Sequence, residues 1–469
     1  MKHTIYIALL LAFPVVSCTG WLDVEPRSQV KDEELFSTEA GFKEALAGVY
    51  ALLVTDALYV KELRFGMVGV LAHEWDYQNT SYEDETTYNY EGTNPTNRIE
   101  NIWQGLYNAV ANANAILEVI DDKKNVFSGA NHAIIKGEAL ALRAFIHLDL
   151  LRCFGASPGT GVDRPAIPYV TRYAPLQSPQ LTVGEVIDRV LVDLDSATFY
   201  LEADPLYTGE EITELVDNGY LLNRQLHLNY YAARALQARA YLYKGEYTLA
   251  AAHAREVILS GRFPWASRQD LIDGVDYTGA TEHLWAIDVN NLQTIAETYF
   301  QTTGGSNVFS ITRTSLLNYH ESITDDYRYL YLYTAGTGAN SESRYIAKYN
   351  VPSGDDAYYT NKMVMIKIAE MHFILAEALH HDGGDYLPSL NATREARGVT
   401  PLATVDDFDA TLVAEYRKEF IGEGQLFFLY KRRNMENIPN TDVNPVEVKG
   451  YIFPLPDSER EAADRNDNR

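Results

Sequence analysis

Cysteine is scarce in this chain: only Cys18 and Cys153 occur among 469 residues. A fold stabilised by several disulfide bonds is therefore excluded, and stability must come from a large hydrophobic core. Cys153 lies in an apolar segment, where burial raises the pKa of a thiol. We expect a structural cysteine there rather than a catalytic nucleophile. We also expect no disulfide, because Cys18 matches the pattern of a different modification.

Positive charge is also in short supply. Lys and Arg total 39 against 65 Asp and Glu, which gives a formal net charge of −26. Nucleic-acid binding needs a basic face, so this balance disfavours it. It equally disfavours electrostatic adhesion to an anionic membrane. The acidity fits a soluble surface and identifies no ligand.

Motifs of the common enzyme classes are missing. The sequence has no Walker A pattern, no G-x-G-x-x-G and no G-x-S-x-G. Glu377-x-x-His380 is a lone E-x-x-H, whereas a di-iron site needs two. The acidic glycine segment 382–385 could hold calcium but is more typical of a turn. The many carboxylates permit a paired-acid glycosidase, yet nothing selects a pair. We therefore predict no enzyme, no cofactor and no metal site.

The N-terminus has the pattern of an export signal. Lys2 precedes a mostly apolar run at residues 5–16, which is too short to span a bilayer. Val15-Val16-Ser17-Cys18 resembles the bacterial lipobox, which implies that residues 1–17 are a cleaved signal peptide. The resemblance also implies that Cys18 carries acyl chains such as palmitate, which would anchor the protein to a membrane. The alternative is an ordinary signal peptide followed by a chance cysteine.

A segment at residues 138–155 is apolar almost all the way round. A helix of this kind is buried and surrounded by other helices, so we expect a mainly α-helical body around it. Its polar residues are spaced to pair along the helix, Arg143 with His147 and Asp149 with Arg152. Gly155 is expected to end the helix in a left-handed conformation. The apolar residues are Leu140, Leu142, Phe145, Ile146, Leu148, Leu150, Leu151 and Phe154.

The same segment resembles the signature helix of the SusD/RagB family, the surface-exposed nutrient-binding lipoproteins of Bacteroidetes. The resemblance rests on Glu138-Ala139, on Leu142-Arg143-Ala144-Phe145 and on Phe154-Gly155. Further family-like elements follow in the expected order: Trp21-Leu22-Asp23, Gly48-Val49-Tyr50, Trp103, Asp326-Tyr327-Arg328, Lys348-Tyr349, residues 366–379, Asn391, Arg394, Arg397-Gly398, Glu415 to Glu419, Glu423-Gly424 and Pro454-Leu455-Pro456. Leu426 and Leu429 depart from the family, which usually has Arg and Asp there.

The resemblance implies a mainly α, SusD/RagB-like fold with tetratricopeptide-like helix pairs and long irregular loops that carry the ligand and partner surfaces. We expect a lipidated tether at residues 18–38, an N-terminal helical region at 39–264 and a C-terminal region at 265–469. Residues 229–258 read as one helix pair, with the turn at Gly245. Residues 363–381 are interpreted as part of the same helical packing, and short β-like runs are expected at 284–289 and 345–349.

Residues 72–98 are rich in aromatic and acidic residues and lack helical or strand periodicity. Long loops without structure of their own are often functional. Tyr and Trp rings can stack on the apolar face of a sugar, while carboxylates and amides can bind its hydroxyls. Alternatively, the rings simply pack, or the loop is solvated or faces a transporter. The predicted ligand-binding residues are Trp75, Asp76, Tyr77, Tyr82, Tyr88, Asn89 and Tyr90, with Tyr299 and Asn307 from a second loop.

Two functional hypotheses remain open. The resemblance implies a cell-surface lipoprotein of the outer membrane that binds an oligosaccharide, or an oligopeptide, and delivers it to a SusC-like TonB-dependent transporter. The alternative is a secreted glycan hydrolase on a helical frame. A purely structural interaction protein merges with the first hypothesis, because the transporter is itself a protein partner. The sequence alone does not identify the ligand.

Overall fold

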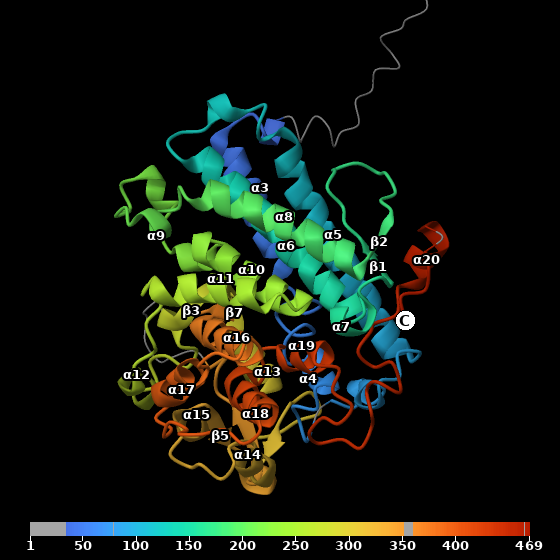
Figure 1. The fold of residues 1–469 in the computed structure, drawn as a ribbon, viewed down its shortest axis with the longest axis vertical. Coiled ribbons are helices and arrows are strands. Elements are labelled where there is room, and N and C mark those ends of the chain that lie inside the picture. Colours follow the sequence, from blue (N-terminus) through green and yellow to red (C-terminus); the bar gives the residue numbers. More distant parts are fainter. Residues whose placement is uncertain (1–33, 78, 351–359, 464) are drawn as a thin grey trace, which may run out of the picture.

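The computed structural model describes residues 34–77, 79–350, 360–463 and 465–469. The predicted signal peptide, Cys18 and most of the predicted tether lie outside these ranges. Within them the protein is mainly α-helical (Figure 1). The apolar side chains of its helices and short strands form a continuous core. The predicted division at residue 264 stays a prediction.

Helix α6 (Asn131–Phe154) is the buried helix that the sequence predicts. It lies between α8 (Val183–Leu201) and α5 (Thr93–Val119), and α3 (Glu39–Leu53) packs beside α5 (Figure 1). Nearly every α6 residue from Ile134 onward is buried. The hydrophobic character on all sides therefore reflects contact with other elements all round. Helix α8 begins with the capping box of Thr182 and Glu185.

The left-handed stop predicted at Gly155 is wrong, because this residue is extended, with φ −89° and ψ 162°. A Cβ atom here would lie 2.6 Å from the Leu151 side chain, so glycine is required by close packing. The helix end is instead satisfied by Lys431, whose ammonium donates to the carbonyl of Arg152 at 2.5 Å. Buried helix termini need such partners for their free carbonyl groups.

The polar side chains of α6 bind mainly its neighbours. Arg143 forms two hydrogen bonds of 2.7 Å with the carboxylate of Asp193 on α8. The predicted pairing of Arg143 with His147 involves only the main chain, since His147 Nδ1 lies 2.8 Å from the Arg143 carbonyl. The predicted pairing of Asp149 with Arg152 is confirmed. Such pairs join the helices while satisfying buried polar groups.

The predicted helix pair is confirmed as α10 (Tyr230–Lys244) and α11 (Tyr247–Leu259). Gly245 ends α10 with φ 86°, a conformation that favours glycine. Ala250 and Ala254 on α11 are fully buried, and such small side chains let paired helices approach closely. Helix α16 (Ile368–His381) packs against α11, and α17 (Leu387–Ala396) against α16 (Figure 1).

The strands are short and antiparallel. Strand β3 (His283–Asp288) pairs with β7 (Lys362–Lys367). Helical packing predicted for 363–367 is therefore wrong, because these residues form β7 and the helix starts only at Ile368. A three-stranded sheet has the order β4-β6-β5. The other strand bounds are β1 Pro165–Pro168, β2 Gln180–Thr182, β4 Ile311–Thr312, β5 Tyr333–Ala335 and β6 Ser343–Ile346.

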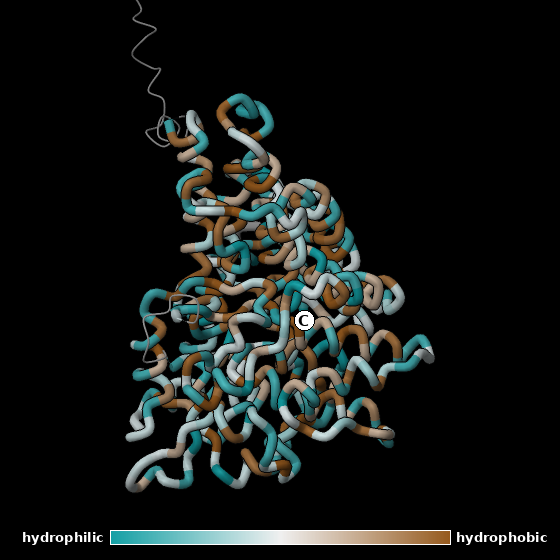
Figure 2. Tube along the Cα trace, turned by 90° about the vertical axis from the view of Figure 1, so that its left-hand side faces the viewer, coloured by the Kyte–Doolittle hydropathy of each residue, from teal (hydrophilic) through white to brown (hydrophobic). Residues whose placement is uncertain are grey.

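Shorter helices connect these elements. Their bounds are α4 Met67–Leu71, α7 Pro158–Gly161, α9 Pro205–Thr208, α12 Arg268–Ile272, α13 Leu292–Tyr299, α14 Arg313–Tyr319, α15 Tyr327–Tyr331, α18 Phe408–Phe420, α19 Leu426–Arg432 and α20 Asp457–Ala463. Hydrophobic and hydrophilic residues are interspersed along the trace (Figure 2). In the described ranges, no helix is both long and apolar enough to cross a membrane.

Many charged residues of the family-like motifs meet in one buried ionic network. Arg328 contacts Asp326 at 2.7 Å and Glu419 at 3.2 Å, and Arg397 contacts Glu419 at 2.7 Å. Burial alone would raise the pKa of Glu419, but Arg397 and its other cationic neighbours hold this pKa well below its usual value. The motif residues therefore stabilise the C-terminal packing. Further members are Glu282, Lys348, Lys367, Arg394, Glu415, Lys418 and Glu423.

Candidate functional site

The aromatic segment at 72–98 is more ordered than the sequence predicts. It contains two short 3-10 helices, Thr80–Tyr82 and Glu85–Thr87, and α5 already starts at Thr93. The Asn79 carboxamide accepts a 2.8 Å hydrogen bond from the Ser81 amide and so caps the first turn. The expectation of a loop without structure is therefore wrong, because side-chain caps fix short turns that leave no long-range periodicity.

Four of the predicted binding aromatics are buried, with 2% to 5% of their surface exposed: Trp75, Tyr82, Tyr88 and Tyr90. Trp75 donates to the Phe65 carbonyl at 2.9 Å, Tyr82 to Glu62 at 2.9 Å and Tyr88 to the Leu71 carbonyl at 2.8 Å. Desolvation raises the pKa of all three tyrosines, so their hydroxyls stay protonated donors.

The prediction that these four rings are presented for stacking is contradicted by their burial. Their polar groups already have protein partners, and their faces contact other rings: Trp75 lies 5.6 Å from Phe309 and 5.9 Å from Phe300. The Arg98 guanidinium covers the Tyr82 ring at 3.7 Å. These side chains form the support of the loop.

Asp76 and Asn89 bind within the protein. The Asp76 carboxylate accepts from the Thr312 amide at 2.5 Å and from the Ser315 hydroxyl at 3.0 Å, at the start of α14. A carboxylate is favourable at a helix N-terminus. Asn89 is exposed and donates to Asp84 at 2.7 Å. Asp76 thus positions one loop on another, and Asn89 stabilises a local turn.

The two residues predicted from the second loop lie near the first. Asn307 is exposed and accepts a 2.6 Å hydrogen bond from Asn79. Tyr299 is half-buried, and its hydroxyl donates to Asp56 at 3.2 Å. The structure therefore brings the two predicted loops together, although most of their polar groups hold the loops to each other.

Tyr77 is the exception, because 58% of its surface is exposed. Its backbone forms an antiparallel bridge with Ser310, with hydrogen bonds of 3.0 and 3.1 Å. This bridge places the ring at a surface cavity of about 340 Å³. The cavity is lined by Tyr77, Gly304, Gly305, Val308, Ser310, Thr312, Ala339, Asn340, Glu342, Ser343 and Tyr345. We call it the Tyr77 cavity.

Three chain segments form the Tyr77 cavity, and a glycine lets two of them approach closely. Gly304 has φ 76°, and a Cβ atom on it would lie 2.5 Å from the Asn340 amide nitrogen. That nitrogen instead donates to the Thr303 carbonyl at 2.8 Å. The main chains also meet where the Thr337 amide donates to the Thr302 carbonyl at 3.0 Å. A side chain at Gly304 would strain the backbone and displace the Asn340 carboxamide.

The side chains that line the Tyr77 cavity suit an uncharged polar ligand. It offers one exposed aromatic face, the hydroxyls of serine and threonine and a single charged side chain, Glu342. Glu342 is exposed and forms no ion pair among the described residues. Stacking on the ring combined with hydrogen bonds to its rim suits a molecule with an apolar face and polar edges.

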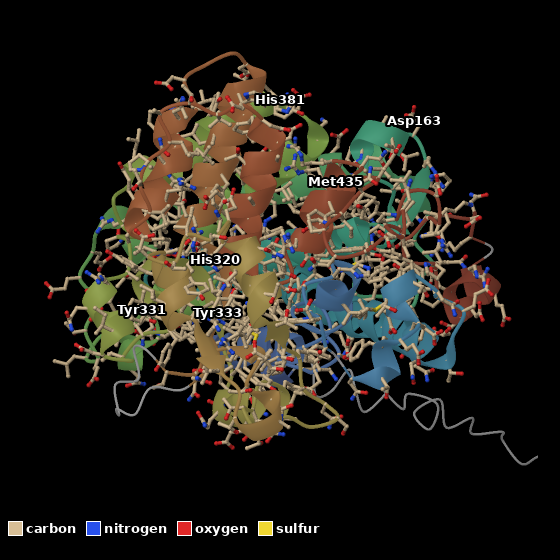
Figure 3. All side chains as sticks on the ribbon, turned by 90° about the horizontal axis from the view of Figure 1, so that it is seen from below. Asp163, His320, Tyr331, Tyr333, His381 and Met435 are labelled. Carbon is tan, nitrogen blue, oxygen red and sulfur yellow. The ribbon has the colours of Figure 1, made fainter. Side chains whose placement is uncertain are left out.

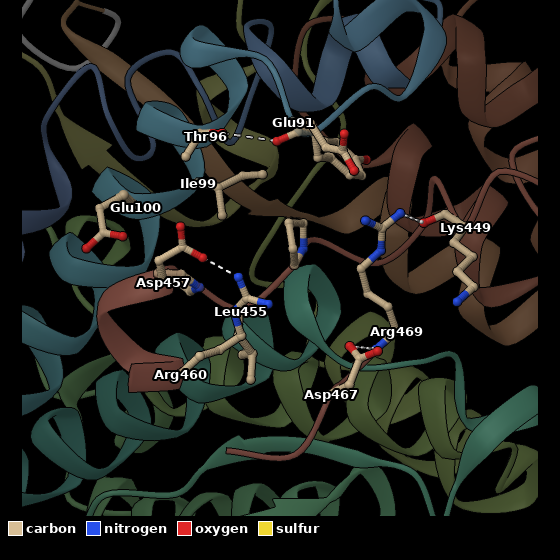
Figure 4. A pocket seen from close by; sticks show the side chains of 13 residues that line it. Glu91, Thr96, Ile99, Glu100, Lys449, Leu455, Asp457, Arg460, Asp467 and Arg469 are labelled. Atoms are coloured by element: carbon tan, nitrogen blue, oxygen red, sulfur yellow. Dashed lines mark hydrogen bonds and ion pairs between the residues drawn. The ribbon is translucent and has the colours of Figure 1, made fainter. Parts of the chain in front are cut away.

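A larger cavity, of about 530 Å³, lies between the start of α5 and the C-terminal segment (Figure 4). Tyr90 lines it, but the Tyr90 hydroxyl donates to the Gly450 carbonyl. Arg460 is paired with Asp457, and the amide of Arg469 donates to Asp467 at 3.0 Å (Figure 4). Because its aromatic ring is buried and Arg460 is already paired with Asp457, this cavity is less suited to stacking than the Tyr77 cavity.

Candidate catalytic and metal positions have structural partners. Glu377 binds Arg432 and Arg433, and His380 stacks on Phe408 at 4.0 Å. Burial raises the pKa of the Cys153 thiol to about 12, which agrees with the structural role predicted for it. In the described ranges, no group of three or more His, Cys, Asp or Glu residues is arranged to hold a metal ion.

Comparisons with known proteins agree with this fold. Residues 20–208 match the family described as "Starch-binding associating with outer membrane", a SusD-like family. A SusD-like protein of Formosa agariphila is 23% identical, over 96% of this chain and 95% of its own.

Solved structures share the architecture. A SusD superfamily protein from Bacteroides thetaiotaomicron aligns with a TM-score of 0.74 and 21% identity, covering 92% of this chain and 100% of that chain. A surface glycan-binding protein A from Bacteroides uniformis aligns with a TM-score of 0.70 and 16% identity, over 92% and 99%. The chain is thus similar in sequence to SusD-like proteins and shares the fold of SusD superfamily structures.

Of the eleven residues that line the Tyr77 cavity, only Tyr77 is among the predicted ligand-binding residues. Asn340, Glu342, Ser343 and Tyr345 lie more than 260 positions after Tyr77 and come from the region of β6. The one local signal was the cluster of glycines at 304–305, 336 and 338, which marks sharp turns and close backbone approach. Nothing local connects that cluster with Tyr77.

Proposed function

We propose that this protein is a surface lipoprotein that binds an oligosaccharide in the Tyr77 cavity and passes it to a SusC-like TonB-dependent transporter of the outer membrane. The observation that carries the proposal is the exposed Tyr77 ring beside a polar cavity of about 340 Å³. A cavity of this size suits one or two sugar rings.

The family match also supports glycan binding at the outer membrane. The matching family is described as starch-binding and outer-membrane associated, and one structural neighbour is a glycan-binding protein. The lipobox-like residues 15–18 supply the proposed anchor at Cys18. An oligopeptide remains the alternative ligand, because amides and carboxylates bind peptide groups as well as hydroxyls.

Isothermal titration calorimetry with neutral oligosaccharides and with oligopeptides tests the proposed ligand. Tyr77→Ala should weaken the binding of the matching oligosaccharide at least tenfold, about 1.4 kcal/mol. Tyr173→Ala is the matched control, because Tyr173 is 49% exposed and does not line the cavity. Equal affinity of both variants would remove the site assignment.

Three further measurements test the other parts of the proposal: binding without hydrolysis, the lipid anchor at Cys18 and the contact with the transporter. Absence of new reducing ends after incubation with bound glycans separates a binding protein from a hydrolase. Mass spectrometry of the N-terminal peptide from native cells should show acyl chains on Cys18. Copurification with a large outer-membrane barrel should persist in the Tyr77→Ala variant, because transporter contact and ligand contact involve different surfaces in this proposal.

A further inference from the structure

A third cavity concentrates positive charge in an otherwise acidic protein. It has a volume of about 420 Å³ and lies between the segment after α6 and the segment after α19. Arg164, Lys431, Lys449 and Arg469 line it. Along the described chain, no aspartate or glutamate lines this cavity. We call it the basic cavity.

Two of these cations have donors that the described protein leaves unused. The Lys431 ammonium is buried and donates to the carbonyls of Arg152 at 2.5 Å and Cys153 at 3.5 Å. An ammonium has three donors, so one finds no acceptor among the described residues. Arg469 Nε is likewise buried without a hydrogen-bond partner in the described structure. Buried unpaired donors of this kind are unfavourable unless a ligand or water satisfies them.

The charge of Lys431 is also uncompensated. Desolvation by burial lowers its pKa to about 7, and no carboxylate lies within ion-pair distance of it in the described ranges. The other lysine of the cavity, Lys449, is exposed and has φ 54°, a conformation rare for a residue with a side chain. Such backbone conformations are often found at binding sites.

The acidic residues Asp163, Glu447 and Asp467 lie close in sequence to the lining of the basic cavity but do not line it. Asp163 precedes Arg164 but is exposed and does not line the cavity. Figure 3 shows Asp163 and Met435, the neighbour of Asn434, on the same side of the molecule. At physiological ionic strength, charges more than about 8 Å apart are largely screened. The charged side chains that line the cavity itself are all basic.

From these observations we infer that the basic cavity binds the anionic group, a carboxylate or a sulfate, of a ligand of about monosaccharide size. Guanidinium groups match carboxylate and sulfate oxygens through paired hydrogen bonds. The volume exceeds the need of an inorganic ion and fits one acidic sugar ring. This site shares no lining residue with the Tyr77 cavity, so it goes beyond the proposed function.

Calorimetric titration of the purified full chain with sodium glucuronate and with sodium sulfate tests the inference, with glucose as the uncharged control. We expect saturable binding of glucuronate or sulfate and none of glucose. Arg164→Ala combined with Lys449→Ala should weaken that binding at least tenfold. The single variant Lys449→Ala, at an exposed position, should weaken it in the same direction without disturbing the fold.

A control variant, Lys124→Ala combined with Arg172→Ala, removes two exposed cations elsewhere and changes the net charge equally. It should retain the affinity of the unmodified chain. The inference is overturned if neither anion gives saturable binding, or if the two double variants bind equally. Tyr77→Ala should lose neutral oligosaccharide binding but keep anion binding in the basic cavity. The two proposals can therefore fail independently of each other.

Discussion

The indole Nε1 of Trp75 donates a 2.9 Å hydrogen bond to the carbonyl oxygen of Phe65. The ring also packs near Phe309, at a centroid distance of 5.6 Å. Trp75 therefore fixes the chain just before Tyr77, and the two adjacent aromatic positions have separable roles. One maintains the loop, and the other is open to a ligand.

Trp75→Ala should lower the free energy of unfolding by about 3–5 kcal/mol, because it removes a large buried side chain and leaves a cavity. Urea denaturation followed by circular dichroism measures the change. Tyr77→Ala is the matched comparison and should change stability by less than about 0.5 kcal/mol, since that ring is mostly exposed. Unchanged stability of Trp75→Ala would contradict its supporting role.

Asp193→Ala should destabilise the protein by about 3–5 kcal/mol, because it leaves the buried Arg143 without its carboxylate partner. Denaturant titration measures this loss. Lys244→Ala provides the contrast, since it removes an ion pair with the exposed Asp188 and should cost no more than about 1 kcal/mol. Equal effects of the two substitutions would show that burial does not govern these pairs.

Glu74 should make stability fall as pH rises. Desolvation raises its pKa to about 8 in the folded protein, and its carboxylate also accepts from the Gly422 amide at 2.8 Å. The usual carboxyl pKa of the unfolded chain lies near 4.5. Between these values the folded state holds a proton that the unfolded state releases. Stability from this group is thus full below about pH 4.5 and is lost as pH rises toward 8.

Glu74→Gln keeps the shape and the acceptor but cannot ionise. Relative to this variant, the unmodified protein should lose up to about 1.4 kcal/mol per pH unit between pH 5 and 8. The difference between the two proteins is the informative quantity, because buried histidines such as His147, with a pKa lowered to about 4, change stability in the opposite sense. Parallel pH profiles would show that Glu74 ionises normally.

The charge of Glu342 should make the Tyr77 cavity selective for uncharged ligands. Oligosaccharides that carry a carboxylate beside the binding ring should bind more weakly than neutral ones of equal length by about 1 kcal/mol, a factor of roughly five. Glu342→Gln should reduce this difference, as should raising the salt concentration. Calorimetry with matched neutral and acidic oligosaccharides measures it. Selectivity that survives the substitution would have another source.

The helical body could be predicted from local patterns because those patterns report burial. The all-round apolar segment became α6, Thr182 and Glu185 marked the start of α8, and Gly245 marked the turn between α10 and α11. Patterns failed where side chains at distant positions decide the conformation. Gly155 is extended, a Cβ atom there would meet Leu151, and Lys431 binds the helix end from a distant part of the chain.

In the aromatic loop at the candidate site, too, local sequence patterns do not predict the conformation. Its composition was correctly seen as unusual, but composition does not say which side of a chain faces water. Trp75, Tyr82, Tyr88 and Tyr90 are buried because rings and carbonyls from other segments surround them. Tyr77, whose backbone pairs with Ser310, keeps 58% of its surface exposed.

By itself the sequence determined the class of fold and the helices around α6, since hydrophobic periodicity and capping are local properties of the chain. Only the tertiary structure decided which aromatic ring stays open, which glycines and polar groups meet it in the Tyr77 cavity, and where four basic side chains line one cavity with no aspartate or glutamate among the described lining residues. The physical reason is that burial and charge compensation depend on neighbours in space, and those neighbours lie tens to hundreds of positions apart.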